Sequence, residues 1–288
     1  MSGKRNPNYH HEGKPYLDGY KAISAPKMSV RLQAIRGDRA AIEFRGFPPK
    51  ARDDLVNALG DKITVQESDW NCVLMFTTNT RNKPFDDKRV RHALTLAVDR
   101  YEASKYLSNI AIVKTPGGIV YPSHPLAATS DELEQLTGFS RDIEASRAKA
   151  RALLKEAGAE GLEFSFNNRG VDQPYKVVGT WLVDQWRQVG LKPKQRVQPS
   201  PQFYATLRKK YDFDVSIDFN CQSVVNPIAD VSKFLCSAGN HYSGCENAKL
   251  DAIYGRLLRA ETADQQRAIM RELEKEAIDT AGTNLTLW

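Results

Sequence analysis

The second half of the sequence alternates between strand-like and helix-like segments, and this order constrains the fold more than any other feature. Strand-like segments occupy residues 162–168, 192–198 and 212–218. Helix-like segments occupy residues 174–190 and 201–210 between them. Strands that alternate with helices of about 10 to 17 residues are typical of an α/β sheet. The sequence therefore predicts an α/β fold.

The rest of the chain adds further strands and helices. The apolar run at 69–80 contains β-branched and aromatic residues, which favours a buried strand. A shorter strand is predicted at 40–44. Proline at the start and glycine just after the end favour a helix at 48–59. Three more helices are predicted, one at 142–158 that ends at Gly158 and two within 247–280 that are joined around 261–264.

Residues 81–100, RNKPFDDKRVRHALTLAVDR, place seven basic side chains, including His92, in twenty positions. Asp86 and Asp87 are typical of a helix start, where a carboxylate is stabilised by the positive end of the helix dipole. Apolar residues follow at helical spacing and predict one buried stripe, namely Val90, Leu94, Ala97 and Val98. The arginines at 89, 91 and 100 are expected to face solvent or to anchor neighbouring loops.

The chain carries a formal net charge of +6, with a pI of about 9.0. Ordinary solvated helix faces explain this charge, and nucleic-acid binding is the alternative. A nucleic-acid-binding protein would be expected to show stacking aromatics among the basic residues, a known module or zinc-finger spacing, and the sequence shows none of these. We therefore expect no nucleic acid as a partner.

Catalytic and membrane signals are also missing from the sequence. There is no Walker loop, GxGxxG or GxSxG motif, and the five histidines lack a metal-binding spacing, so we predict no enzyme, no metal site and no cofactor. No apolar run approaches the roughly 20 residues that a membrane helix needs. The first 21 residues lack the apolar core of a secretory signal. Such a core would be missing both from a cytoplasmic protein and from a fragment that starts after a removed signal.

Residues 82–100, NKPFDDKRVRHALTLAVDR, closely resemble the signature of extracellular solute-binding proteins of family 5. These proteins are the oligopeptide, dipeptide and nickel receptors of ABC importers. Other blocks resemble the family pattern in the same order, at 5–21, 142–158, 183–217 and 247–278. The resemblance covers nearly the whole chain, and several ordered blocks are more specific than any one of them.

This resemblance implies a periplasmic binding protein type II fold with two lobes that close on a ligand. Because family members are much longer than this chain, we expect a fragment that holds the second lobe and part of the first. Residues 1–64 would belong to the first lobe, residues 65–281 would form the second, and residues 282–288 would begin the return to the first. A periplasmic location, a monomeric state and ABC permease subunits as partners are also implied.

The resemblance bears on the four cysteines as well. Oligopeptide-binding members carry a bridge between two positions that match Cys72 and Cys221. Cys236 and Cys245 are close enough in sequence to form a second, local bridge. Four buried free thiols are the alternative.

Ligand contacts are implied at the ends of the predicted strands. In dipeptide-binding relatives an arginine before the PY helix holds the ligand carboxylate, and an ungapped count places Arg169 there; a surface loop arginine is the alternative. In peptide-binding relatives an aspartate holds the ligand α-amino group, and Ser223 stands at that position, which puts recognition of a free peptide N-terminus in doubt. Neighbouring residues predicted to line the site are Asn220, Gln222, Asn226, Trp70 and Asn71, with turn formation or packing as the alternative.

The predicted function is therefore the solute-binding component of an ABC importer. It would capture a small peptide-like or opine-like solute by binding and lobe closure, without bond chemistry. A receptor for a non-peptide solute, either a sugar or a metal chelate, is the alternative within this class. A basic nucleic-acid-binding protein is the alternative from another class.

Overall fold

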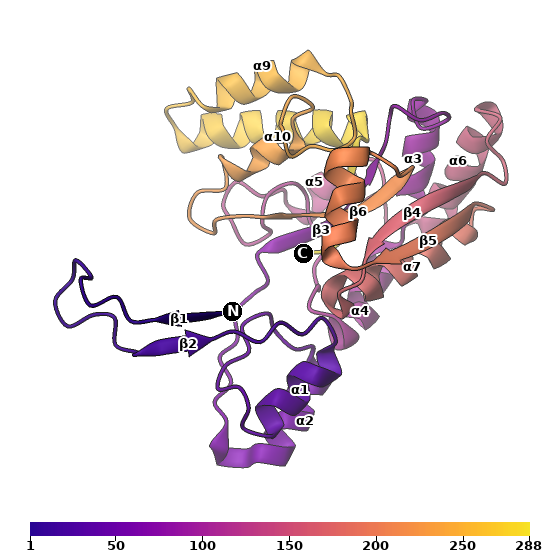
Figure 1. Ribbon diagram of the computed structural model, residues 1–288. Helices are drawn as coiled ribbons and strands as arrows, with labels where there is room; N and C mark the ends of the chain where they lie inside the picture. The colour runs from indigo at the N-terminus through magenta and orange to yellow at the C-terminus, as the bar shows by residue number, and fades with distance from the viewer.

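A five-stranded mixed sheet lies at the centre of the computed structural model, which describes residues 1–288 (Figure 1). In spatial order its strands are β5 (Lys192–Gln198), β4 (Glu163–Arg169), β6 (Val215–Cys221), β3 (Cys72–Thr78) and β7 (Thr283–Leu285). Strand β4 is parallel to β5 and β6, whereas β3 is antiparallel to β6 and β7. The predicted α/β class and the four longer predicted strands are confirmed.

Strand β3 is buried along its whole length because apolar layers cover both faces of the sheet. Leu74 and Phe76 belong to the apolar cluster on one face, and Val73 and Met75 belong to the cluster on the other. Successive side chains of a strand point to opposite faces. A strand that is buried on both faces therefore reads as a continuous apolar run.

Helices form the two covering layers. The layer beside β4 and β5 contains α3 (Lys88–Leu96), α4 (Arg100–Ile110), α6 (Ile143–Glu156) and α7 (Val177–Arg187). The layer on the other face contains α5 (Ser130–Glu134), α9 (Ala248–Leu257) and α10 (Ala263–Thr280) (Figure 1). Helix α6 follows the N-cap Asp142 and precedes Gly158, whose φ is +63°. The predicted helices at 142–158 and 247–280 are confirmed.

Short helical turns extend two of the predicted helices at the β4–β5 edge. The π-helical turn η2 (Asp172–Lys176) leads into α7, and α8 (Ser200–Ala205) continues into a second such turn, η3 (Thr206–Lys210). The 3₁₀ turns are η1 (Gly60–Lys62) and η4 (Asp230–Phe234).

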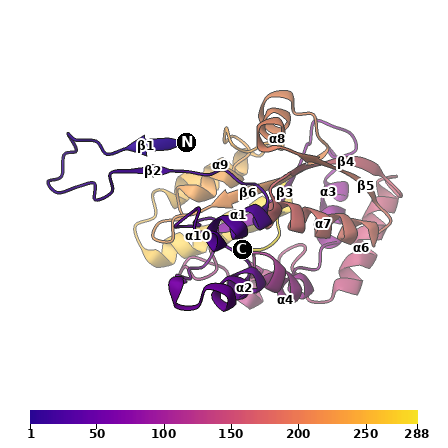
Figure 2. The ribbon, with the colours of Figure 1, turned by 60° about the horizontal axis from the view of Figure 1, so that its bottom comes forward.

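The N-terminal residues form a separate group of elements beside one end of the sheet (Figures 1 and 2). They comprise the hairpin strands β1 (Ser2–Lys4) and β2 (Gly19–Lys21) and the helices α1 (Met28–Arg36) and α2 (Pro49–Leu59). Helix α2 ends at Gly60, as predicted. The strand predicted at 40–44 is wrong, because this segment has no neighbouring strand with which its backbone could form a ladder.

The basic stretch at 81–100 begins helix α3 as predicted. The Asp87 carboxylate accepts the backbone N–H of Arg89, which caps the helix. The predicted stripe of Val90, Leu94, Ala97 and Val98 is buried. Only one of the three arginines, Arg89, is exposed.

Arg91 and Arg100 are buried and donate to backbone carbonyls. For these two residues the structure selects loop anchoring over solvent exposure.

The C-terminal residues lie inside the sheet layer. Residues 283–285, which the resemblance places at the start of the return to the first lobe, form edge strand β7, and all of residues 281–288 are buried. The side chain of Trp288 stacks edge-on against Tyr121. None of the helices is both long enough and apolar enough to span a bilayer.

Candidate ligand-binding site

The predicted ligand-binding residues lie along one edge of the sheet. Parallel strands β4, β5 and β6 all end at this edge, and antiparallel β3 begins there. Arg169 is the last residue of β4, Asn220 lies near the end of β6, and Trp70 and Asn71 directly precede β3. In open α/β sheets, ligands bind outside the carboxyl ends of the strands. The topology therefore brings the candidates to the edge where a ligand is expected.

Arg169 is held between two tyrosine rings. Its guanidinium carbon lies 4.7 Å from the ring centroid of Tyr175 and 5.2 Å from that of Tyr204. Its Nε donates to the Ser200 hydroxyl at 2.8 Å, which fixes the guanidinium plane. No carboxylate of the chain forms a salt bridge with it, unlike Arg196 on the next strand, which pairs with Asp212. An immobilised, unpaired guanidinium is suited to bind a carboxylate in two parallel hydrogen bonds.

The stacking continues beyond Tyr204. Arg208 lies 4.5 Å from the Tyr204 ring centroid on one side and 5.9 Å from that of Tyr242 on the other, and its Nε donates to the Tyr242 hydroxyl. Cations and aromatic rings thus alternate from Tyr175 and Arg169 to Tyr242. The sequence reasoning missed this arrangement, although Tyr204 and Arg208 are four residues apart, a spacing that places two side chains on one helix face.

The N-terminal group of elements approaches the sheet edge close to Arg169. The backbone N–H of Met28 donates to the Asp172 carboxylate at 3.1 Å, and the Asp172 N–H reaches the carbonyl of Pro26. Burial raises the pKa of the Tyr175 hydroxyl above 10, an effect that the positive charges of Arg169 and Arg45 oppose. The region around Arg169 is thus bounded by the sheet edge on one side and by residues 26–45 on the other.

The side chain of Ser223 is already engaged within its own loop. Its hydroxyl accepts the backbone N–H groups of Val225 and Asn226, and its own backbone N–H donates to the Asp230 carboxylate at 2.7 Å. Asn226 accepts the N–H of Ile228 in the same exposed loop. Both side chains therefore stabilise turns. The carboxylate that follows the loop, Asp230 at the start of η4, was not among the residues predicted from the sequence.

Three further candidates hold the backbone of the sheet edge in place. The Gln222 side chain donates to the Ile119 carbonyl at 2.5 Å and accepts the Tyr121 N–H at 2.9 Å. Asn71 donates to the Gln222 carbonyl, and Asn220 donates to the Asp230 carbonyl. The side-chain amides of these three residues therefore form hydrogen bonds with the backbone of the chain itself.

Trp70 lines a small hollow at the same edge. Tyr121, Lys114, Thr115 and Trp288 line the hollow with it. The indole N–H of Trp70 is buried and has no hydrogen-bond partner in the chain. Buried donors are almost always paired, so this N–H is available to an acceptor that enters the hollow.

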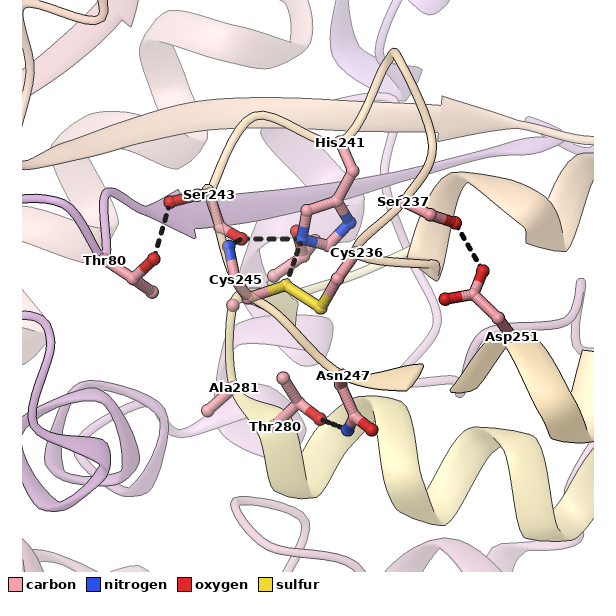
Figure 3. Close-up of a disulfide and its surroundings, with 12 residues drawn as sticks. Thr80, Cys236, Ser237, His241, Ser243, Cys245, Asn247, Asp251, Thr280 and Ala281 are labelled. Carbon is pink, nitrogen blue, oxygen red and sulfur yellow. Dashed lines mark hydrogen bonds between the residues drawn. A yellow bond between two sulfur atoms is a disulfide. The ribbon is translucent and has the colours of Figure 1, made fainter. Parts of the chain in front are cut away.

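The four cysteines form two disulfides. Cys72 and Cys221 face each other in the register of β3 and β6, and their bridge joins these strands at the sheet edge. Cys236 and Cys245 close a short loop between η4 and α9 (Figure 3).

Residues 1–242 match the model of a protein family described as bacterial extracellular solute-binding proteins, family 5 Middle. The chain belongs to this family. Members of family 5 are solute-binding proteins of transport rather than enzymes, and they are periplasmic or extracellular. The recognition made from the signature at 82–100 is thereby confirmed.

Relatives of known name support the same assignment. Di/tripeptide-binding protein 2 of Pseudomonas aeruginosa is 30% identical over 156 residues, which are 53% of this chain and 26% of that protein. The periplasmic oligopeptide-binding protein OppA of Escherichia coli is 21% identical over 282 residues, which are 95% of this chain and 49% of that protein. The family 5 chain thus spans about half, or less, of the length of these relatives.

A solved structure shows the fold. Helicobacter pylori DppA, in complex with the peptide STSA, superposes with a TM-score of 0.81 at 16% identity, over 99% of this chain and 54% of that one. The predicted type II periplasmic binding protein fold is confirmed.

Proposed function

We propose that this chain belongs to the solute-binding component of an ABC importer and that it binds the carboxylate of a small peptide-like or opine-like solute. The environment of the Arg169 guanidinium is the observation that supports this proposal most. Its guanidinium is stacked between two rings, oriented by Ser200 and free of any carboxylate of the chain. Preorganisation of this kind lowers the entropic cost of binding.

The amino end of the solute would lie near Ser223 and Asp230. The hydroxyl of Ser223 is neutral and already accepts two backbone N–H groups, so it supplies no negative charge to an ammonium group. The Asp230 carboxylate lies beside the same backbone position. A solute whose amine is acylated needs no charged partner there, whereas a protonated amine, either the secondary amine of an opine or a free peptide N-terminus, would use Asp230.

The wider context of the receptor is also proposed from family membership. Residues 1–64 would be part of the first lobe, residues 65–281 the second, and residues 282–288 the link back to the first. The receptor would work as a periplasmic monomer that delivers its solute to permease subunits, with no bond made or broken.

Thermal-shift and calorimetric titrations of the chain test the proposal. The ligands are matched sets of free dipeptides, N-acetylated dipeptides, dipeptide amides, N-carboxyalkyl amino acids and neutral sugars. We expect stabilisation by the carboxylate ligands and none by the dipeptide amides. Binding of sugars alone, or of amides as tightly as acids, would contradict it. Loss of affinity on N-acetylation would assign the amino group to Asp230.

A further inference from the structure

Two sulfur atoms and one imidazole nitrogen lie close together in the loop between η4 and α9 (Figure 3). Cys236 and Cys245 form the disulfide that closes this loop. His241 lies within the loop, with its Nε2 atom 3.3 Å from the Cys245 sulfur. Nε2 and the two sulfurs lie within 4.8 Å of one another.

The hydrogen bonds of His241 leave Nε2 as the atom with the lone pair. Its Nδ1 is 3.0 Å from the Lys233 carbonyl oxygen, and a carbonyl can only accept, so Nδ1 carries the hydrogen. In a neutral imidazole Nε2 is then an acceptor, and it lies 2.7 Å from the Ser243 hydroxyl, which donates to it. A backbone carbonyl that holds one ring nitrogen while the other faces sulfur is the arrangement found around metal-binding histidines.

Gly282 lies directly against part of this cluster. A Cβ atom placed on Gly282 would lie 2.8 Å from the Ser243 hydroxyl and 3.2 Å from both the Cys245 sulfur and His241 Nε2. Two of the three donor atoms, Cys245 Sγ and His241 Nε2, therefore lie against Gly282 together with the Ser243 hydroxyl, and a side chain at this position would crowd them.

We propose that Cys236, His241 and Cys245 bind one Zn²⁺ ion when their disulfide is open. A dithiol reductant would supply two electrons and two protons, so that the disulfide becomes two thiols and the reductant becomes a disulfide. Zinc binding then releases the two thiol protons, and water completes four-coordination. Two thiolates and one imidazole form a donor set that zinc prefers.

The loop can accommodate the change that this requires. Zinc–sulfur bonds of about 2.3 Å and zinc–nitrogen bonds of about 2.0 Å need the two sulfurs to separate once they are no longer bonded. Cys236 and Cys245 lie in irregular backbone between η4 and α9, so no helix or strand has to break. The loop thus has two alternative covalent states, a disulfide and a zinc dithiolate.

The first test compares zinc binding by the oxidised and reduced chain, measured by competition with a chromophoric chelator. His10→Gln/His11→Gln is the working background, because these adjacent exposed histidines would add weak sites of their own. We expect reduction to add one zinc per chain. The Cys236→Ser/Cys245→Ser variant, which keeps Cys72 and Cys221, should not gain it. No gain on reduction, or an equal gain in that variant, would overturn the proposal.

A second set of measurements tests whether the His241 imidazole is a zinc ligand and whether a side chain at position 282 disturbs the site. His241→Gln should weaken zinc affinity at least tenfold, and Gly282→Ala should weaken it although it removes no ligand. Reduced chain loaded with Co²⁺ should show sulfur-to-metal charge transfer and tetrahedral d–d bands, a readout that needs no variant. Octahedral Co²⁺ without sulfur bands, or unchanged affinity in folded His241→Gln, would overturn the site.

Discussion

Arg100 donates from Nε and Nη2 to the carbonyl oxygen of Leu285, at 2.9 and 2.7 Å. The bond joins the end of the family signature to edge strand β7, across 185 residues of sequence. The same guanidinium donates to the carbonyls of Thr95 and Gly138 and lies 4.6 Å from the ring centroid of Phe139. The last arginine of the basic stretch is therefore a buried connector between helix α4, a loop and the sheet.

Replacement of Arg100 should be far more damaging than replacement of an exposed arginine of the same stretch. In Arg100→Leu the Leu285 carbonyl would lose its side-chain donor in a buried site, and we expect the free energy of unfolding to fall by about 3 kcal/mol. Arg89→Leu is the matched control and should change it by less than about 0.5 kcal/mol. Urea denaturation followed by circular dichroism measures both values, and equal losses would show that Arg100 is not a structural anchor.

Arg169 should determine affinity for a carboxylate ligand. We expect Arg169→Ala to weaken binding by roughly 100-fold and Arg169→Lys by less, because lysine keeps the charge but not the bidentate geometry. Arg196→Ala, on the neighbouring strand, should leave the affinity within about twofold because its salt bridge with Asp212 is exposed. Isothermal titration calorimetry with the best ligand of the proposed screen measures the difference. An unchanged affinity in Arg169→Ala would remove this residue from the site.

The two disulfides should contribute unequally to stability. The Cys72–Cys221 bridge spans 149 residues, and the Cys236–Cys245 bridge spans 9. On the chain-entropy model the longer loop adds about 4 to 5 kcal/mol and the shorter one about 2 to 3 kcal/mol. Guanidinium unfolding of the two double-alanine variants should show the larger loss for Cys72→Ala/Cys221→Ala. The reverse order would mean that native-state contacts of the short loop outweigh loop closure.

Glu274 should make stability depend on pH. Its carboxylate is buried, accepts the Ile119 N–H at 2.7 Å and pairs with Arg271. Burial raises its pKa above 4.5. The folded chain then holds this proton more tightly than the unfolded chain, so the contribution of Glu274 to stability is greatest below about pH 4.5 and falls as pH rises through the raised pKa.

Glu274→Gln removes this dependence while it keeps an acceptor for the Ile119 N–H. We expect the stability difference, wild type minus variant, to fall as the pH rises above about 4.5. Thermal unfolding scans at a series of pH values, from acidic to mildly alkaline, measure it. A difference that rises with pH would show that the Arg271 pair outweighs burial.

Most local elements could be predicted from the sequence. Strand β3 was recognisable because burial on both faces requires a continuous apolar run, and helix α3 was recognisable from Asp87 and its apolar stripe. Helix α2 was recognisable from its prolines and Gly60. The family signature was visible too, since it consists of contiguous residues. The segment 40–44 has strand-like residues, and the prediction failed because a strand also needs a partner.

The roles of the polar residues, in contrast, depend on contacts between segments that are far apart in the sequence. Arg91 and Arg100 carry the same charge as Arg89, yet they are buried. Their guanidinium groups donate to the carbonyls of Thr280 and Leu285, which are far away in the sequence but adjacent in the fold. Gln222, although predicted to line the ligand site, holds the backbone at Ile119 and Tyr121. A side chain's hydrogen-bond partners come from anywhere in the chain. Residue type and spacing therefore predict an element and its buried face, but the partner that fixes a polar group's role exists only after the chain has folded.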